Sequence, residues 1–212
     1  MKRYRIKFSK SHSLRFLGHL DTLALFQKVI IMVRLPIVYS KGKTPHPKTL
    51  FASPLSLGIS SKSEYLDIAM KKETTREQIL EMNNFLPDGL RILDLRELNE
   101  NEAFASKETK ASVYEIHLPK IDDIDSIENL KKDEILIEKQ SKKQKTIEII
   151  NIKPLIYHYS ISGNILTVTL STGRDNLRPM EITKYLNIEK TKYVRCDILK
   201  QKSGRLISLW EE

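Results

Sequence analysis

The chain has 212 residues, of which 40% are hydrophobic and 30% are charged, and its formal net charge is +9. This composition favours a packed core over intrinsic disorder. The longest apolar-rich run, residues 23–33, is interrupted by Gln27 and Lys28 and is shorter than the roughly 18 residues that a membrane span requires. Because no apolar signal core follows the basic N-terminus, we expect a cytoplasmic protein without a membrane partner.

The positive charge is concentrated in the first third of the chain. Residues 1–63 hold twelve Lys and Arg residues and one acidic residue, Asp21, a net charge of +11, so residues 64–212 together carry −2. A basic segment of this kind suits a polyanion, and nucleic acid is the commonest polyanion in the cytosol. The alternative is that a lysine-rich composition reflects a biased genome. We favour nucleic-acid contact, because compositional bias alone does not remove the acids from 63 residues.

The first half of the chain predicts one complete α+β unit. Residues 3–8 alternate polar and apolar side chains, which predicts a half-buried strand. Asp21 is expected to be the N-cap of a helix whose apolar residues recur at helical spacing as far as Pro36. The same periodicities predict strands over 49–52 and 64–70, a helix over 75–82 capped by Thr74 or Thr75, and a strand over 90–98. This β-α-β-β-α-β order is the ferredoxin-like arrangement.

The second half repeats that order less clearly. Residues 99–110 are polar and aperiodic and predict a linker between a domain of residues 1–98 and a second of residues 111–212. The predicted elements beyond it are strands over 113–118, 134–138, 146–150, 155–160, 165–170 and 193–201, helices over 121–132 and 179–186, and a basic turn over 139–145. The expected fold class is therefore α+β, with two ferredoxin-like (βαββαβ) halves in tandem.

A first candidate cluster stands where the first helix is expected to begin, at residues 15–21. His19 and Asp21 are two residues apart and would form a general acid–base pair. The free N–H groups of a helix start, together with Arg15, would attract a phosphate. The plainer alternative is that Asp21 only caps the helix and His19 fills a polar gap beside it.

A second candidate cluster is the loop of residues 39–48. Prolines on both sides of His46 fix the backbone around it, which would suit an acid–base histidine or an RNA backbone. The polar side chains around that histidine are Tyr39, Ser40, Lys41, Lys43, Thr44 and Lys48. The alternative is an ordinary surface turn in a lysine-rich protein.

Two acids, Glu64 and Asp67, follow in the strand predicted over 64–70. Because side chains alternate along a strand, they point to opposite faces. We expect them to form salt bridges with the basic loop, and the alternative is that they are ordinary residues of a strand surface.

Metal and cofactor chemistry has little support in the sequence. His19, Asp21 and His46 would together make a two-histidine, one-carboxylate metal site, but no His-x-x-x-His or Glu-x-x-His spacing supports it. The single cysteine, Cys196, excludes an internal disulfide and any iron–sulfur cluster built from this chain alone. No P-loop, nucleophile-elbow, HExxH or dinucleotide-binding pattern occurs. We therefore expect neither a metal nor a cofactor.

Motif residues between positions 5 and 67 form a connected series. They are Arg5 and Phe8, Arg15-Phe16-Leu17, His19-Leu20-Asp21, Leu35-Pro36, Tyr39-Ser40, Gly42, Pro45-His46-Pro47, Pro54-Leu55, Leu57-Gly58, Glu64-Tyr65 and Asp67. This series resembles the radical-SAM-linked bacterial domain of unknown function, whose members are fused to a radical SAM domain or encoded near one. The resemblance implies a separately encoded radical SAM enzyme as partner and a role in RNA or ribosome modification. Ile31-Met32-Val33 departs from it, since the family usually carries arginines there.

These observations lead to three hypotheses about function. The first is an RNA- or ribonucleoprotein-binding accessory protein that is not itself an enzyme. Its expected phosphate contacts are Arg15, Lys41, Lys43 and Lys48. The second is an RNA-processing or RNA-modifying enzyme in which His19 and His46 act as acid and base and Asp21 orients one of them. The third is a protein-interaction scaffold for the radical SAM partner.

Overall fold

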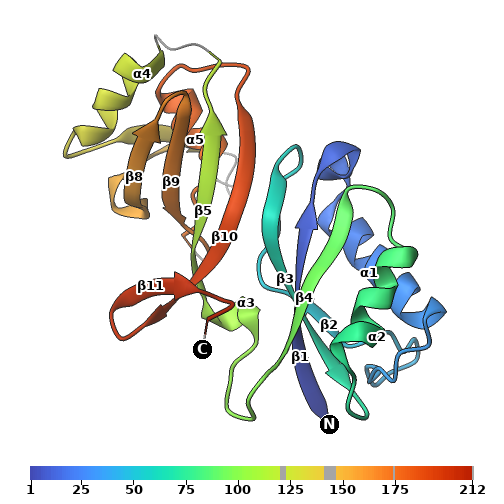
Figure 1. The fold of residues 1–212 in the computed structure, drawn as a ribbon. Coiled ribbons are helices and arrows are strands. Elements are labelled where there is room, and N and C mark those ends of the chain that lie inside the picture. Colours follow the sequence, from blue (N-terminus) through green and yellow to red (C-terminus); the bar gives the residue numbers. More distant parts are fainter. Residues whose placement is uncertain (120–122, 141–146, 174, 212) are drawn as a thin grey trace. The chain divides into compact units, whose positions relative to one another are not determined.

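The strand predicted over residues 3–8 is β1 (Lys2–Lys10), the central strand of the N-terminal sheet in the computed structural model (Figure 1). The structure describes residues 1–119, 123–140, 147–173 and 175–211. β1 pairs antiparallel with β3 (Ser60–Met70) on one edge and with β4 (Leu90–Glu97) on the other. The short β2 (Thr49–Phe51) pairs antiparallel with β3. These pairings give the strand order β4-β1-β3-β2.

One face of this sheet forms the main core. Tyr4, Ile6 and Phe8 alternate along β1 and are buried, as the alternation predicted. They pack against α1 (His19–Met32) and α2 (Arg76–Leu80), which lie on the same face of the sheet (Figure 1). The rings of Phe8 and Phe26 meet edge to face with centroids 4.8 Å apart. Because each buried aromatic ring removes a large apolar area from water, this cluster fixes α1 on the sheet.

The start of α1 differs from the expectation. The N-cap residue is Gly18, and Asp21 is the third residue of the helix. The backbone of Gly18 accepts the first helical hydrogen bond, from the amide of Thr22 at 2.9 Å. The Asp21 carboxylate folds back over the helix start, because a Cβ atom on Gly18 would lie 2.9 Å from Oδ2 of Asp21. Asp21 therefore lines the first turn without being the N-cap.

The second helix begins as the sequence indicated. Thr75 is the N-cap of α2, and its hydroxyl accepts a hydrogen bond from the amide of Gln78 while the Gln78 side chain accepts one from the Thr75 amide. This reciprocal pair satisfies two of the four free N–H groups of the helix start. A 3-10 turn, η2 (Glu81–Asn84), continues the helix, and another, η1 (His12–Phe16), precedes α1.

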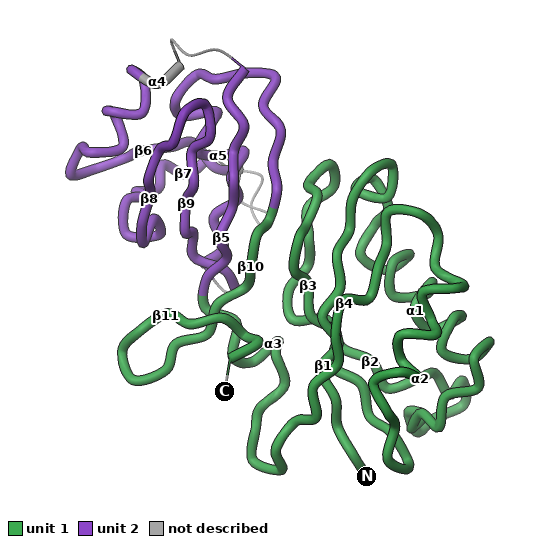
Figure 2. The backbone as a smooth tube through the Cα atoms, in the orientation of Figure 1, with its two compact units in different colours: residues 1–110, 195–212 green, residues 111–194 purple. Residues whose placement is uncertain are grey.

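Contacts divide the chain into two compact units, and Figure 2 shows them in different colours. Unit 1 consists of Met1–Lys110 and Arg195–Glu212, and unit 2 of Ala111–Val194. The sequence analysis instead placed the boundary after residue 98 and kept the C-terminal residues with the second half. Residues 99–110, expected to be a linker, contain α3 (Ala105–Glu108) and belong to unit 1.

The C-terminal segment completes the second face of the unit 1 sheet. Unit 1 receives most of β10 (Lys192–Lys202) and all of β11 (Arg205–Ser208), which pair antiparallel with each other. Leu209 and Ile198 are fully buried there beside Tyr65 and Ala105. Trp210 stacks on Tyr65, with ring centroids 6.2 Å apart.

Unit 2 contains a three-stranded antiparallel sheet in the order β5-β9-β8. Its strands are β5 (Thr109–His117), which begins in unit 1, β8 (Ile156–Ser162) and β9 (Ile165–Ser171). β8 and β9, which correspond to the strands predicted over 155–160 and 165–170, pair antiparallel as a hairpin around Gly163. The other elements are α4 (Asp123–Ser126), η3 (Ile127–Lys131), the paired strands β6 (Leu136–Gln140) and β7 (Ile147–Asn151), η4 (Lys153–Leu155) and α5 (Pro179–Tyr185). Most of the predicted basic turn over 139–145 lies outside the described residues.

The chain is thus a mixed helix-and-strand protein, as expected. No helix among the described residues is long and apolar enough to cross a membrane.

Candidate functional site

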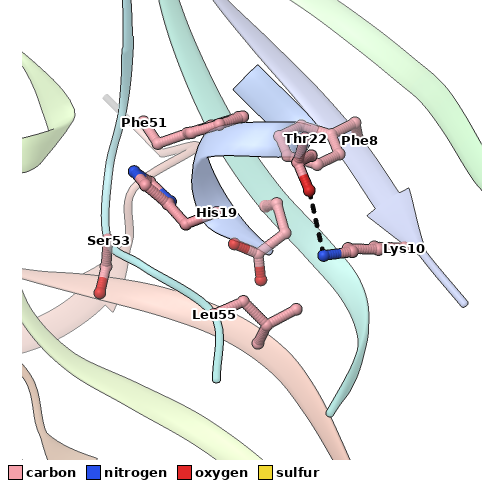
Figure 3. Close-up of a pocket in the computed structure, with 8 residues that line it drawn as sticks. Phe8, Lys10, His19, Thr22, Phe51, Ser53 and Leu55 are labelled. Carbon is pink, nitrogen blue, oxygen red and sulfur yellow. Dashed lines mark hydrogen bonds between the residues drawn. The ribbon is translucent and has the colours of Figure 1, made fainter. Parts of the chain in front are cut away.

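A small pocket lies in unit 1 where α1 begins, and Figure 3 shows the side chains around it. Its walls come from β1, α1, β3 and the segment that follows β2. The lining residues are Phe8, Lys10, His19, Thr22, Phe51, Ser53, Leu55 and Glu64. The cavity holds about 20 Å³, which is room for about one water molecule. A pocket of this size can hold a bridging water but no nucleobase or larger ligand.

Lys10 is the buried cation of this pocket, with only 4% of its surface exposed. Its Nζ donates to the carbonyl of Leu17 at 2.7 Å and to the hydroxyl of Thr22 at 3.1 Å, a bond drawn in Figure 3. The Thr22 hydroxyl in turn donates to the carbonyl of Gly18 at 2.8 Å. Burial lowers the pKa of Lys10, and the negative charge of Glu64 opposes that effect. Lys10 therefore ties the turn before α1 to the end of β1.

His19 is the first residue of α1 and packs its ring against Phe51, with centroids 5.1 Å apart. Burial lowers the pKa of His19, and the nearby charge of Lys10 lowers it further. The imidazole is therefore neutral at pH 7, a state in which it can donate one hydrogen bond and accept another.

Glu64 closes the pocket from β3 and forms a buried ion pair. Arg195 donates from Nε to Oε1 of Glu64 at 2.7 Å and from NH2 to Oε2. The Arg195 side chain is 1% exposed and that of Glu64 is 5% exposed. Arg195 also donates to the carbonyls of Ser53 and Pro54. The expected salt bridge between Glu64 and the basic loop is therefore wrong, since the carboxylate faces a guanidinium that is 131 residues away in the sequence.

Asp67 lies on the opposite face of β3 and likewise has a buried partner. It accepts two hydrogen bonds from Arg5, at 2.8 and 3.1 Å, and one from the amide of Ala105 at 2.6 Å. Both side chains of this ion pair are fully buried. Arg5 also donates to Glu102 and to the carbonyl of Leu209. Asp67 therefore holds α3 and the C-terminal segment on the sheet and does not pair with the basic loop.

The loop predicted as the second cluster is closed by its own hydrogen bonds. Tyr39 and Pro47 form an antiparallel bridge, and the amide of Ser40 donates to the carbonyl of His46 at 2.9 Å. The hydroxyl of Ser40 accepts from the amide of His46 at 3.1 Å, and Nδ1 of His46 lies 3.2 Å from the carbonyl of Thr44. Pro47 is buried beneath the loop. These contacts fix the exposed imidazole within the loop itself.

The lysines of this loop face solvent. Lys41, Lys43 and Lys48 are exposed, and across the part of the chain that the structure describes none of them pairs with an acidic side chain. Tyr39 is partly exposed and has the ammonium of Lys71 at 5.9 Å from its ring centroid. The loop therefore presents cations that have no protein counter-ion.

The structure does not assemble His19, Asp21 and His46 in one pocket. His19 lines the pocket, whereas neither of the other two does. The base of the loop meets α1 at Gln27, whose side chain donates to Thr49 and to the carbonyl of Pro47. Gln27 lies eight residues after His19, which is about 12 Å along the helix. Among the described residues no group of three His, Cys, Asp or Glu side chains has the geometry to hold a metal ion.

Two features of the site escaped the sequence analysis. Lys10 was counted only as part of the basic segment, although its place in an alternating strand with Phe8 signals burial of one of the two faces. Phe16 was quoted only as a motif residue, but its ring is 63% exposed and has the guanidinium of Arg15 at 4.8 Å from its centroid. An aromatic residue directly after a cation and two residues before Gly18 is the signal that would have indicated it.

The fold and these features define a mixed helix-and-strand protein with a small pocket at the start of α1 and an exposed cationic loop. Residues 3–179 match the model of the DUF2344 family, described as uncharacterized proteins conserved in bacteria, so the chain belongs to that family. This agrees with the expected domain of unknown function.

A crystal structure of a Cbf5-Nop10-Gar1 complex is similar with a TM-score of 0.47 and 12% sequence identity. That similarity covers 92% of this chain and 48% of the other, so the chain spans about half the length of the chain it resembles. No curated protein matches the chain.

Proposed function

We propose that this protein binds RNA or a ribonucleoprotein as an accessory protein. The observation that carries the proposal is the loop of residues 40–48, which holds Lys41, Lys43 and Lys48 in solvent on a backbone closed by the Ser40–His46 hydrogen bonds. Exposed cations that pair with no acidic side chain among the described residues suit phosphate groups, because a bound phosphate would neutralise their charge.

The surrounding charge supports the same ligand. Arg5 and Lys10 are buried and take no part, which leaves most of the cations of residues 1–63 at the surface. The exposed ones are Lys2, Lys28, Arg34, Lys41, Lys43, Lys48 and Lys62. Asp21 remains the one acid of that segment. A surface of this sign attracts a polyanion and gives binding that weakens with salt.

The test measures RNA affinity by fluorescence anisotropy at 50 and 200 mM salt. The variant carries Lys41→Ala, Lys43→Ala and Lys48→Ala. We expect its affinity to fall by at least tenfold and its salt dependence to become shallower, since each phosphate contact contributes to the slope. The matched control removes three exposed lysines of unit 2, Lys132, Lys184 and Lys192, and should bind like the wild type. Equal losses in both variants would overturn the proposal.

The proposed partner is a radical SAM enzyme encoded separately, and the sequence resemblance supports it. Purified protein should recover that enzyme from a cell extract of its source both before and after ribonuclease treatment if the two proteins touch directly. Recovery that persists in the triple lysine variant would favour a protein scaffold over an RNA-binding role.

The proposed architecture is two ferredoxin-like halves in tandem. The order β4-β1-β3-β2 supports this in the first half, because β1 lies between two antiparallel neighbours and the helices lie on one face. The order β5-β9-β8 supports it in the second half, in which the β6–β7 pair would be an insertion.

The positions of His19 and His46 do not favour the hypothesis of an RNA-processing enzyme. His19 lines a cavity of about 20 Å³, whereas His46 is exposed on the loop and does not line that cavity. Acid–base catalysis needs both groups within hydrogen-bond reach of the reacting atoms. A His46→Ala protein that loses turnover on an RNA substrate, but keeps its affinity for it, would restore that hypothesis.

A further inference from the structure

Phe16 is an exposed aromatic side chain with a cation, Arg15, beside its ring. It lies in η1, the 3-10 turn before α1, and 63% of its surface is exposed. Arg15 holds its guanidinium 4.8 Å from the ring centroid. Single exposed apolar side chains are common on protein surfaces, but an aromatic ring with a guanidinium beside it offers a stacking face and a cation together, which suits a ligand that carries a flat ring and an anionic group.

The backbone that carries Phe16 is held on two sides. The carbonyl of Arg15 accepts a hydrogen bond from the amide of Gly58 at 2.9 Å. The carbonyl of Leu17 accepts one from the buried ammonium of Lys10 at 2.7 Å. The ring edge also approaches Gly58, since a Cβ atom there would lie 3.7 Å from Cε1 of Phe16. The ring is therefore presented on a fixed backbone, which lowers the entropy cost of contact with a ligand.

The shape and charge of this surface select the kind of ligand. The pocket beside it is too small for a nucleobase, so a base must bind on the surface and not inside. A flat ring flanked by a guanidinium matches the face of an unpaired base and the phosphate next to it. In a duplex the base faces are stacked on one another and are not available.

We propose that Phe16 stacks on an unpaired nucleobase of single-stranded RNA while Arg15 contacts the adjacent phosphate. This inference rests on the proposed function and names the form of RNA that is bound. The lysines of the loop supply affinity for the backbone, and Phe16 supplies the preference for single strands.

The experiment compares a single-stranded RNA of about 12 nucleotides with its duplex on Phe16→Leu, Phe16→Trp and wild type. Phe16→Leu keeps the apolar character and removes the aromatic face. We expect it to bind the single strand about 5- to 150-fold more weakly, the range that one lost base stack represents, and to bind the duplex as the wild type does. Phe16→Trp should retain the affinity for the single strand. Its tryptophan fluorescence should be quenched by the single strand more strongly than that of the wild type, whose one tryptophan is Trp210.

Leu20→Ala provides the control, because Leu20 is 74% exposed on the first turn of α1 and has no aromatic face. It should leave RNA binding unchanged. If Leu20→Ala and Phe16→Leu weaken binding equally, or if binding is abolished only for a protein partner, the patch is a protein-docking surface and the stacking inference fails. If the wild type binds through its lysines but Phe16→Leu has no effect, only this inference fails. If the wild type binds no RNA, the proposed function fails.

Discussion

Replacing Glu64 by Gln isolates the buried ion pair that closes the pocket. The change keeps the size of the side chain and removes its charge, so the Arg195 guanidinium, which is 1% exposed, loses the carboxylate charge of Glu64. Breaking a buried pair from one side costs about 3–5 kcal/mol. Because Arg195 keeps its bonds to the carbonyls of Ser53 and Pro54, we expect the lower end, about 3 kcal/mol.

The assay is urea unfolding followed by circular dichroism. With a slope of about 2 kcal/mol per molar, a loss of about 3 kcal/mol moves the midpoint down by about 1.5 M. The double variant with Arg195→Met should recover most of the loss, because it removes the buried cation as well. The control, Lys2→Gln, breaks the exposed pair between Lys2 and Glu97 and should leave the midpoint where it is. A Glu64→Gln loss below about 1 kcal/mol, or a double variant that is less stable than the single one, would refute the reasoning.

Two further outcomes follow from local geometry. Gly89→Ala should destabilise the protein by about 2 kcal/mol, because φ is +90° and the new Cβ would lie 2.7 Å from the carbonyl oxygen of Ser11. The control is Gly204→Ala, where φ is +79° and the space around the new Cβ is open, and it should lower the free energy of unfolding by less in the same urea assay. Because the pKa of His19 is lowered in the fold, the unfolded chain binds more protons once the pH falls below about 6.5, and the free energy of unfolding decreases there. His19→Gln should therefore lose less stability than the wild type between pH 7.5 and pH 5.0, and an unchanged loss would show that the imidazole does not contribute.

Much of the first half could be predicted because its signals are local. The alternation in residues 3–8 identified β1 and its buried face, and Thr75 marked the start of α2. The cap of α1 could not be read in the same way. Asp and Gly are both acceptable N-caps, and only the backbone conformation of Gly18 decides between them.

The partners of the buried charges could not be predicted. Glu64 and Asp67 look alike in the sequence, yet one meets Arg195 and the other meets Arg5 on the opposite face of β3. Such ion pairs depend on which strands lie next to β3 in the fold, and no local pattern of residues predicts those neighbours. For the same reason, the net charge of residues 1–63 overestimates the positive charge on the surface, since Arg5 and Lys10 are buried.

Unit 1 is built from two segments that are far apart in the sequence, and this affects how the protein folds during synthesis. Synthesis on the ribosome delivers residues 1–110 long before residues 195–212 leave the exit tunnel. Until then, Glu64 lacks Arg195, and Tyr65 lacks Asp197 and Trp210. During synthesis the N-terminal part therefore exposes a charged, partly apolar face to solvent. A chain truncated before residue 195 would expose that face permanently and would be a substrate for chaperones or proteases.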